Sequence, residues 1–328
     1  MEARLVDALP TEPGWQFEPK WDGFRALAVR DGGRVEIASK SGKPLARYFP
    51  EVVAMLASLA ADRFVLDGEL ILPVGDVLSF DALQQRLHPA ASRIAKLSRE
   101  TPAQLMLFDL LHLGDDAFAG KPLTERRMAL ERFHAAERRP GLLLSPACPD
   151  VRVAQGWLAH SGGALDGVIA KRLDDAYRPG ERAMFKVKQH RTADCVVGGI
   201  RRTARGGVAS LLLGLYDDEG RLHHVGFTSA IGDADRPAIT AKVDPLVGGE
   251  GFTGKAPGGP SRWTRGKESP WEPLQPDLVV EVTYDQVTAD RFRHGTALHR
   301  WRPDKLPRQC TMDQLIHELR PSELPGLL

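Results

Sequence analysis

The sequence predicts an α+β domain of antiparallel sheets and helices, followed by a smaller all-β barrel domain. The chain has 328 residues, more than a single hydrophobic core usually holds, so two domains are expected. Before residue 190, strand-like and helix-like segments are mixed without a regular βαβ alternation. Beyond it, short apolar segments alternate with glycine-rich turns, which is typical of a Greek-key barrel of the OB type. We therefore predict domains at 1–190 and 191–328.

Alternating apolar and polar side chains predict the strands of the first domain. Residues 24–30 and 34–39 flank the turn residues Asp31-Gly32-Gly33 and indicate a β-hairpin. Residues 64–73 indicate a second strand pair that turns at Asp67-Gly68. The run 104–113 is too apolar for a half-exposed strand, so we expect it to be buried.

Helical spacing of apolar residues predicts four helices in this domain. They cover residues 50–60, 80–87, 125–137 and 153–162. Ser79 and Thr124 are the expected N-caps of the second and third helix. Short strands are then expected at 166–172 and 183–188.

The second domain is predicted to consist mainly of strands. These cover residues 193–202, 209–217, 222–229 and 277–285, with one helix near 235–247. Residues 247–273 have no periodicity and are rich in Gly, Pro and Trp. We expect this segment to be a long functional loop.

Composition and charge narrow the class of protein. Hydrophobic residues make up 42% and charged residues 27%, and no apolar run is long enough to span a bilayer. The N-terminus has no secretory signal pattern, so we expect a soluble, cytoplasmic protein without membrane association. Three separated cysteines, Cys148, Cys195 and Cys310, indicate neither a disulfide framework nor a zinc site. Because the net charge is only +1, binding of a polyanion must depend on local basic clusters.

Lys20, in the stretch EPKWDGFR, is the first candidate for a chemical role. A lysine is a nucleophile only as the free amine, and roughly one in a thousand is neutral near pH 7.5 at the ordinary pKa. Nearby cations, desolvation or a metal ion favour the free amine. Lys186 and Lys188 alternate with Val187, so both ammonium groups should point to one face and could serve this purpose. Taken alone, the same residues also suit a solvated edge strand.

Seven short motifs follow one another along the chain. They are EPKWDGFR (18–25), SKSGK (39–43), LDGE (66–69), FD (108–109), DGVIAK (166–171), KVK (186–188) and RWRPDK (300–305). In this order and spacing they resemble the motifs of the covalent nucleotidyltransferases, the superfamily of ATP-dependent DNA ligases and mRNA-capping enzymes. The resemblance is closest to short bacterial C-type DNA ligases and to the ligase domain of the D type. It implies a nucleotidyltransferase (adenylation) domain followed by an OB-fold domain.

The resemblance implies a reaction in three steps. Lys20 attacks the α-phosphate of ATP and expels pyrophosphate, AMP passes to the 5′-phosphate at a DNA nick, and the 3′-hydroxyl displaces AMP. The implied cofactors are ATP and Mg²⁺, or Mn²⁺ in its place. Transfer of this kind depends mainly on positioning and on neutralising charge at phosphorus.

The resemblance also implies roles for the other motif residues. Lys186 and Lys188 hold the α-phosphate, and Phe108 stacks on adenine. Glu69 and Asp166 hold the metal ion, and Glu69 also approaches the ribose. The remaining nucleotide contacts are the backbone near adenine at Glu18 and Pro19, the ribose contact of Arg25, and Lys40.

Two positions depart from the usual pattern of the family. Lys40 stands where many relatives have arginine, which replaces a bidentate contact by a point charge. Asp166 stands where glutamate is commoner, so its shorter side chain could leave a water between carboxylate and metal.

The final motif is expected to contact pyrophosphate, and other basic residues are expected to contact DNA. The resemblance implies that the final motif assists pyrophosphate departure, which requires two positions of the second domain. DNA contact should be mostly to phosphates, because a nick-sealing enzyme ignores sequence. The final-motif residues are Arg300, Arg302, Asp304 and Lys305, and the DNA candidates are Lys171, Arg201, Arg202, Arg205, Arg262, Arg265 and Lys267.

Other readings of the motifs remain open. A capping-type guanylyltransferase or an RNA ligase shares the lysine motif, and a relative could bind nucleic acid without catalysis. An NAD-dependent ligase would need a domain ahead of Lys20, and only nineteen residues precede it here. The expected partner is nicked double-stranded DNA, and the protein is expected to be a monomer. Binding to DNA would associate it with the nucleoid. A repair polymerase or a Ku-like end-binding protein is a candidate recruiting partner.

Overall fold

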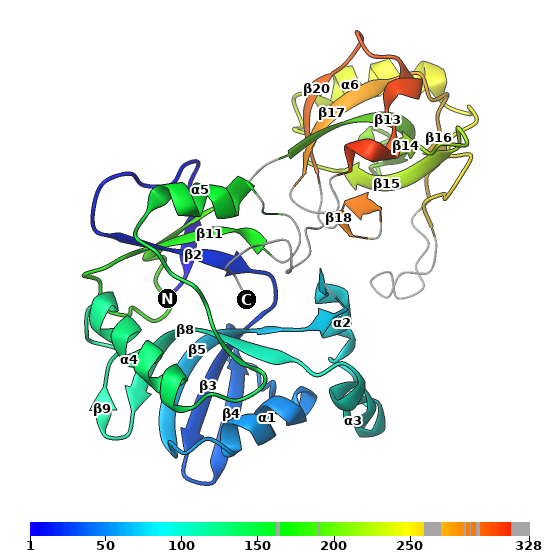
Figure 1. The fold of residues 1–328 in the computed structure, drawn as a ribbon. Helices are drawn as coiled ribbons and strands as arrows, with labels where there is room; N and C mark the ends of the chain where they lie inside the picture. Colours follow the sequence, from blue (N-terminus) through cyan, green and yellow to red (C-terminus); the bar gives the residue numbers. More distant parts are fainter. Residues whose placement is uncertain are drawn as a thin grey trace. The chain divides into compact units, whose positions relative to one another are not determined.

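The computed structural model describes residues 1–75, 77–159, 161, 165–188, 191–258, 270–284, 287–288, 290–292 and 296–315. They form two compact units, one within Met1–Gln189 and the other within His190–Glu318 (Figure 1). Each unit has its own core of buried apolar side chains. Among the described residues, no helix combines the length and apolar character needed to cross a membrane.

The first unit is built on two mainly antiparallel sheets. One has the order β10-β8-β5-β3-β4 and the other β1-β12-β11-β2. The first comprises β10 (Leu142–Leu144), β8 (Gln104–Leu113), β5 (Arg63–Ile71), β3 (Phe24–Asp31) and β4 (Arg34–Ser39), with the short β9 (Asp116–Ala117) paired to β8. The second comprises β1 (Ala3–Leu5), β12 (Met184–Val187), β11 (Leu165–Arg172) and β2 (Trp15–Trp21).

The hairpin of β3 and β4 and the buried strand β8 confirm the predictions for those segments. The predicted strand pair at 64–73 is wrong, because β5 continues through Asp67 and Gly68 without a turn. A Cβ atom at Gly68 would lie 2.6 Å from the carbonyl oxygen of Met106 on β8. Glycine is needed there for close approach of two strands, which the sequence pattern does not distinguish from a turn.

The helices of the first unit are α1 (Pro50–Ala57), α2 (Phe80–Gln85), α3 (Ala91–Glu100), α4 (Leu123–Ala136) and α5 (Val151–Ala159). All four predicted helices are present, and Ser79 caps α2 by accepting a hydrogen bond from the Ala82 amide. Thr124 is not a cap, because α4 already begins at Leu123 after Pro122. The helix α3 was not predicted, since Ile94 is its one buried side chain.

The second unit contains an antiparallel sheet in the order β15-β14-β13-β17-β20. The strands are β13 (Arg191–Arg202), β14 (Val208–Tyr216), β15 (Leu222–Thr228), β17 (Val279–Tyr284) and β20 (Ala297–Trp301), and α6 spans Arg236–Val243 between β15 and β17. This arrangement is that of an OB-fold barrel, as predicted. Of these five strands, β20 is the one that was not predicted.

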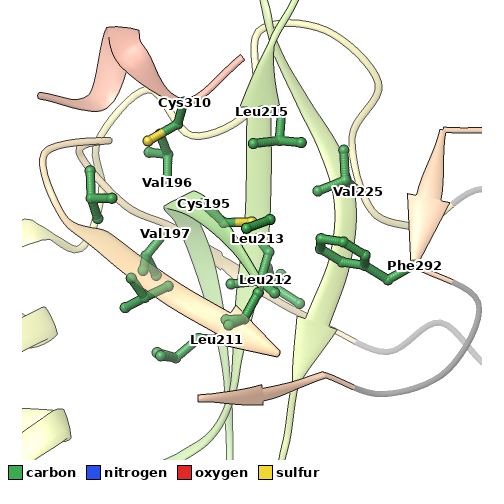
Figure 2. Close-up of a cluster of buried hydrophobic side chains, with 14 of the residues drawn as sticks. Cys195, Val196, Val197, Leu211, Leu212, Leu213, Leu215, Val225, Phe292 and Cys310 are labelled. Atoms are coloured by element: carbon green, nitrogen blue, oxygen red, sulfur yellow. The ribbon is translucent and has the colours of Figure 1, made fainter. Parts of the chain in front are cut away.

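The core of the second unit explains two of the cysteines. Cys195 and Cys310 are fully buried free thiols among side chains such as Leu213, Leu215 and Val225 (Figure 2). Burial raises the pKa of the Cys195 thiol well above its ordinary value. Both cysteines therefore serve as small apolar core residues.

Candidate active site

A cleft of about 270 Å³ in the first unit gathers residues from six of the seven motifs. Its lining comes from strands of both sheets, so the cleft lies between them. The lining residues are Glu2, Ala3, Glu18, Pro19, Lys20, Trp21, Arg25, Lys40, Glu69, Phe108, Ile169, Lys171, Met184 and Lys186. Such a volume is close to the lower range of small-molecule sites.

Strand pairing brings Lys20, Asp166 and Lys188 together although they are far apart in sequence. The strand β11 lies between β2 and β12, and its Val168 is opposite both Pro19 and Val187. Lys20 follows Pro19 and Lys188 follows Val187, so both ammonium groups reach back to Asp166. The Lys20 Nζ–Asp166 Oδ2 distance is 2.5 Å and the Lys188 Nζ–Asp166 Oδ1 distance is 2.9 Å.

Gly167 allows Asp166 to take this position. Its φ is +123°, and a Cβ atom there would lie 2.1 Å from the Val187 carbonyl oxygen. The pairing of β11 with β2 also shifts between Leu165 and Val168. Since only glycine tolerates both the backbone angle and the contact, the Asp-Gly pair is a strand irregularity that orients the carboxylate.

The two candidate metal-binding carboxylates have different electrostatic environments. Burial raises the pKa of Glu69 to about 8, although Lys20 and Arg25 act in the opposite direction. Burial would also raise the pKa of Asp166, but Lys20 and Lys188 together hold it below the ordinary value. Burial, followed by the charges of Lys20 and Lys188, lowers the pKa of Lys186. Lys20 therefore lies among two carboxylates and two further cations.

These carboxylates suit a divalent ion that keeps most of its waters. Within the described ranges, no group of three or more His, Cys, Asp and Glu residues is arranged to hold a metal. Hydrated Mg²⁺ needs only one or two protein carboxylates. Burial raises the pKa of Glu69, and a cation bound beside its carboxyl group would stabilise the ionised form. The residues present thus fit the expected ion.

The raised pKa of Glu69 predicts a specific pH dependence of stability. Between about pH 4.5 and pH 8 the folded state binds more protons at this group than the unfolded state, so stability falls as pH rises. The Glu69→Gln variant has no titrating carboxyl at this position, so this fall in stability with pH should be absent. We expect the stability of the variant relative to wild type to increase from pH 5 to pH 8 by at least about 1.4 kcal/mol, the equivalent of one pKa unit.

Urea denaturation at several pH values measures this difference. The exposed Glu250 provides a matched control, because Glu250→Gln should show no such trend. A Glu69→Gln difference that stays constant with pH would contradict the assigned environment.

The far end of the cleft contains a buried polar network that changes two predictions. Lys171 Nζ lies 2.8 Å from Glu18 Oε2 and 5.0 Å from the centre of the Phe108 ring, and both charged side chains are 3% exposed. Gln16 donates a 2.7 Å hydrogen bond to Glu18 Oε1. The predicted contact of Lys171 with DNA is therefore wrong, because its ammonium group is buried in an ion pair. Glu18 contributes its carboxylate to this network, beyond the backbone role that was expected.

Arg25 and Lys40 lie at the side of the cleft and are both ion-paired. The Arg25 guanidinium stacks 5.0 Å from the Phe108 ring centre and donates through Nε to Asp67 Oδ1 at 2.6 Å. Lys40 Nζ lies 3.1 Å from Glu2 Oε2. Sequence reasoning missed Asp67 and Glu2 as site residues. Asp67 and Glu69 are two residues apart on one strand and so share a face, a signal that could have identified Asp67.

The final motif forms an ion-pair cluster in the second unit. Arg300 Nε lies 2.5 Å from Glu281, and Arg302 Nη2 lies 2.9 Å from Asp304. Arg302 and Lys305 both bind the carboxylate of Asp194, at 2.8 and 2.7 Å. Glu281 and Asp194 were not among the predicted site residues.

The basic candidates for DNA binding fall into three groups. Arg202 is paired with both Asp244 and Glu272, so its charge is already neutralised within the unit. Arg201 stacks 5.5 Å from the centre of the Phe227 ring, and Arg205 is exposed. The other candidates, Arg262, Arg265 and Lys267, lie outside the described residues. DNA contact by Arg201, Arg205 and these three stays a prediction.

Comparison with known proteins agrees with the motif order. The family model "ATP dependent DNA ligase domain" matches residues 4–188, and "ATP dependent DNA ligase C terminal region" matches residues 204–305. The "DNA ligase C2" of Mycolicibacterium smegmatis is 47% identical, over 96% of this chain and 93% of that protein.

Two further similarities concern a larger protein and a solved structure. The "Multifunctional non-homologous end joining protein LigD" of Mycobacterium bovis is 31% identical over 91% of this chain, which covers 37% of that protein. The solved structure "Pmar-Lig_PreS3" is 17% identical with a TM-score of 0.58, covering 88% of this chain and 64% of that one, and shows the shared fold. Because the family models span most of the chain and six of its seven motifs converge in one cleft, the chain belongs to the ATP-dependent DNA ligases.

Proposed function

We propose that this ligase seals nicks with 5′-phosphate and 3′-hydroxyl ends through a covalent Lys20–AMP intermediate. The observation that carries the proposal is the position of Lys20, whose ammonium group is 2.5 Å from Asp166 at a cleft of about 270 Å³. Lys188 binds the same carboxylate and Lys186 lines the same cleft. A structural lysine would not require such a concentration of charge around it.

In the first step, the cleft residues hold ATP and prepare the amine. Phe108 and the buried pair of Glu18 and Lys171 lie where a base can be held, and Arg25 lies beside them. Lys20 gives its ammonium proton to solvent and leaves its ion pair with Asp166 as the free amine. The amine attacks the α-phosphorus and loses a second proton to solvent as the bond forms. The bond from phosphorus to the bridging oxygen breaks as the P–N bond forms, and pyrophosphate departs.

Neutralisation of charge is the main task of the surrounding side chains. Lys186 and Lys188 oppose the negative charge that develops on the α-phosphate. Glu69 and Asp166 would hold Mg²⁺ (or Mn²⁺), which would supply further charge neutralisation at the phosphates. In the later steps the same lysines would face the AMP phosphate as it moves to the DNA 5′-phosphate.

The repair context is supported by the relatives. A protein whose name includes non-homologous end joining matches over 91% of this chain. We therefore place this ligase in DNA repair or end joining, with nicked duplex DNA as its substrate and a Ku-like protein or a repair polymerase as candidate partners. Its OB-fold unit supplies Arg201 and Arg205 as candidate phosphate contacts.

A nick-sealing assay tests the proposed function. Duplex DNA with one labelled 5′-phosphate nick is incubated with the protein, Mg²⁺ and either ATP, GTP or NAD. We expect joined product with ATP alone, seen on a denaturing gel. Joining with GTP or NAD in place of ATP would contradict the nucleotide assignment, and a covalent GMP adduct would favour the guanylyltransferase alternative.

A further inference from the structure

Tyr177 lies on the loop that joins β11 to β12, the two middle strands of one sheet of the first unit. Its amide donates to the carbonyl oxygen of Ala119 at 2.8 Å, and the carbonyl oxygen of Asp175 on the same loop accepts from Arg126 at 2.8 Å. The Tyr177 hydroxyl donates to Asp67 Oδ2 at 2.7 Å. Because Asp67 is on β5 of the other sheet, Tyr177 links the two sheets between which the cleft lies.

The Tyr177 side chain is held at both its ring and its hydroxyl group. Burial, and then the charge of Asp67, raises the pKa of Tyr177 well above its ordinary value, so the phenol stays protonated and acts as a donor. The guanidinium carbon of Arg126 lies 5.9 Å from the centre of the Tyr177 ring. Asp67 is 1% exposed, and a buried carboxylate is unfavourable unless it is paired. The hydroxyl of Tyr177 supplies part of that pairing.

Arg25 supplies the rest of the pairing of Asp67. Arg25 Nε donates to Asp67 Oδ1 at 2.6 Å, and Arg25 Nη2 donates to Asp67 Oδ2, the oxygen that Tyr177 also binds. Two parallel hydrogen bonds of this kind fix the plane of a guanidinium group. The guanidinium carbon of Arg25 lies 5.0 Å from the centre of the Phe108 ring. Asp67 therefore holds Arg25 against the aromatic ring of the cleft.

Arg25 retains one amino group for a ligand. Its Nη2 also donates to the Met1 carbonyl oxygen at 3.1 Å, whereas its Nη1 has no hydrogen-bond partner in the part of the chain that the structure describes. Arg25 lines the nucleotide cleft. It also lines a neighbouring hollow of about 150 Å³ together with Asp67 and Tyr177, which do not line the cleft. An effect of Tyr177 on a bound nucleotide would therefore pass through Arg25.

We propose that Tyr177 is a positioning residue that acts through Asp67 to fix Arg25 in the wall of the cleft, with its Nη1 group available to the nucleotide. This inference rests on the proposed function, in which ATP occupies the cleft. Tyr177 lies outside the seven motifs and does not itself touch the nucleotide. An arginine that is already held in its binding orientation loses less conformational freedom when the ligand binds.

Substitution of Tyr177 by phenylalanine tests this role, because it removes the hydroxyl group and keeps the ring. The rate of AMP adduct formation is measured in single turnover at a series of ATP concentrations. We expect Tyr177→Phe to raise the ATP concentration that gives half the maximal rate by about 3- to 10-fold. The maximal rate should change by less than about twofold, since this split indicates lost binding. A merely structural role would lower stability without raising the ATP requirement.

A matched control and a double-mutant cycle sharpen the test. Tyr284→Phe removes a hydroxyl that donates to the carbonyl oxygen of Gln314 in the second unit, and it should leave both kinetic parameters unchanged. In the Arg25→Lys background, Tyr177→Phe should raise the ATP requirement less than in wild type, because the Nη1 group that it positions is absent. If Tyr177→Phe does not fold, Asp67→Asn takes its place, alone and combined with Arg25→Lys.

The possible outcomes distinguish this inference from the proposed function. An unchanged ATP requirement in Tyr177→Phe overturns the positioning role, while adduct formation by the wild-type protein leaves the proposed function standing. A lower maximal rate without a change in ATP requirement overturns it as well, and so does full additivity with Arg25→Lys. If wild-type protein forms no AMP adduct, the proposed function fails, and the role of Tyr177 fails with it.

Discussion

Lys20→Ala is expected to abolish the covalent AMP adduct. Alanine has no nitrogen with which to attack phosphorus, and the other lysines at the site are placed to hold charge. Lys171 is buried in an ion pair with Glu18, so it is not a free substitute. Incubation with ATP labelled at the α-phosphate, followed by a denaturing gel, measures the adduct.

Two further variants make this experiment specific. Lys20→Arg keeps the positive charge but should also fail, because a guanidinium remains protonated in proteins. Lys96 on α3 is 68% exposed, so Lys96→Ala is a control that should label like wild type. An undiminished adduct on Lys20→Ala would show that another residue is the nucleophile.

Arg126→Ala is expected to cause a large loss of stability in the first unit. The Arg126 side chain is fully buried, and its Nε lies 2.8 Å from Asp109 Oδ1. It also donates to the carbonyl oxygens of Lys121 and Asp175, at 2.7 and 2.8 Å. Removing the guanidinium leaves a buried carboxylate without its counter-ion, which typically costs about 3–5 kcal/mol.

Urea denaturation followed by circular dichroism measures this loss. Arg132 lies on the same helix α4 and is exposed, so Arg132→Ala should change stability by less than about 0.5 kcal/mol. A change of similar size for both variants would contradict the assigned role of the buried pair. Asp109 belongs to one of the seven motifs, and this pair shows that it contributes to the fold.

The grouping of the candidate site residues could be predicted from sequence because these residues lie in short motifs with recognisable spacing. Lys20 and Lys188 each follow a residue of a paired strand, and that pairing brings their ammonium groups to 2.5 and 2.9 Å from the Asp166 carboxylate. The alternation of Lys186 and Lys188 around buried Val187 was visible in the sequence itself.

Residues far apart in the chain account for what sequence could not predict. The sequence around Lys171 does not show that Glu18 lies close to its ammonium group in the fold. Sequence reasoning therefore predicts a DNA contact for Lys171. Asp194 and Glu281 face each other only through the register of two strands, which sequence alone does not specify. The sequence predicts a turn at Gly68 because close approach of strands and tight turns favour the same residue.

Mass spectrometry of the protein after incubation with ATP and Mg²⁺ tests the central claim most directly. Intact protein should gain the mass of one AMP group, and proteolysis should place that group on the peptide containing Lys20. Addition of unlabelled nicked DNA should then remove it as the nick is sealed. AMP found on a different residue, or nick sealing by protein that never carries AMP, would contradict the account.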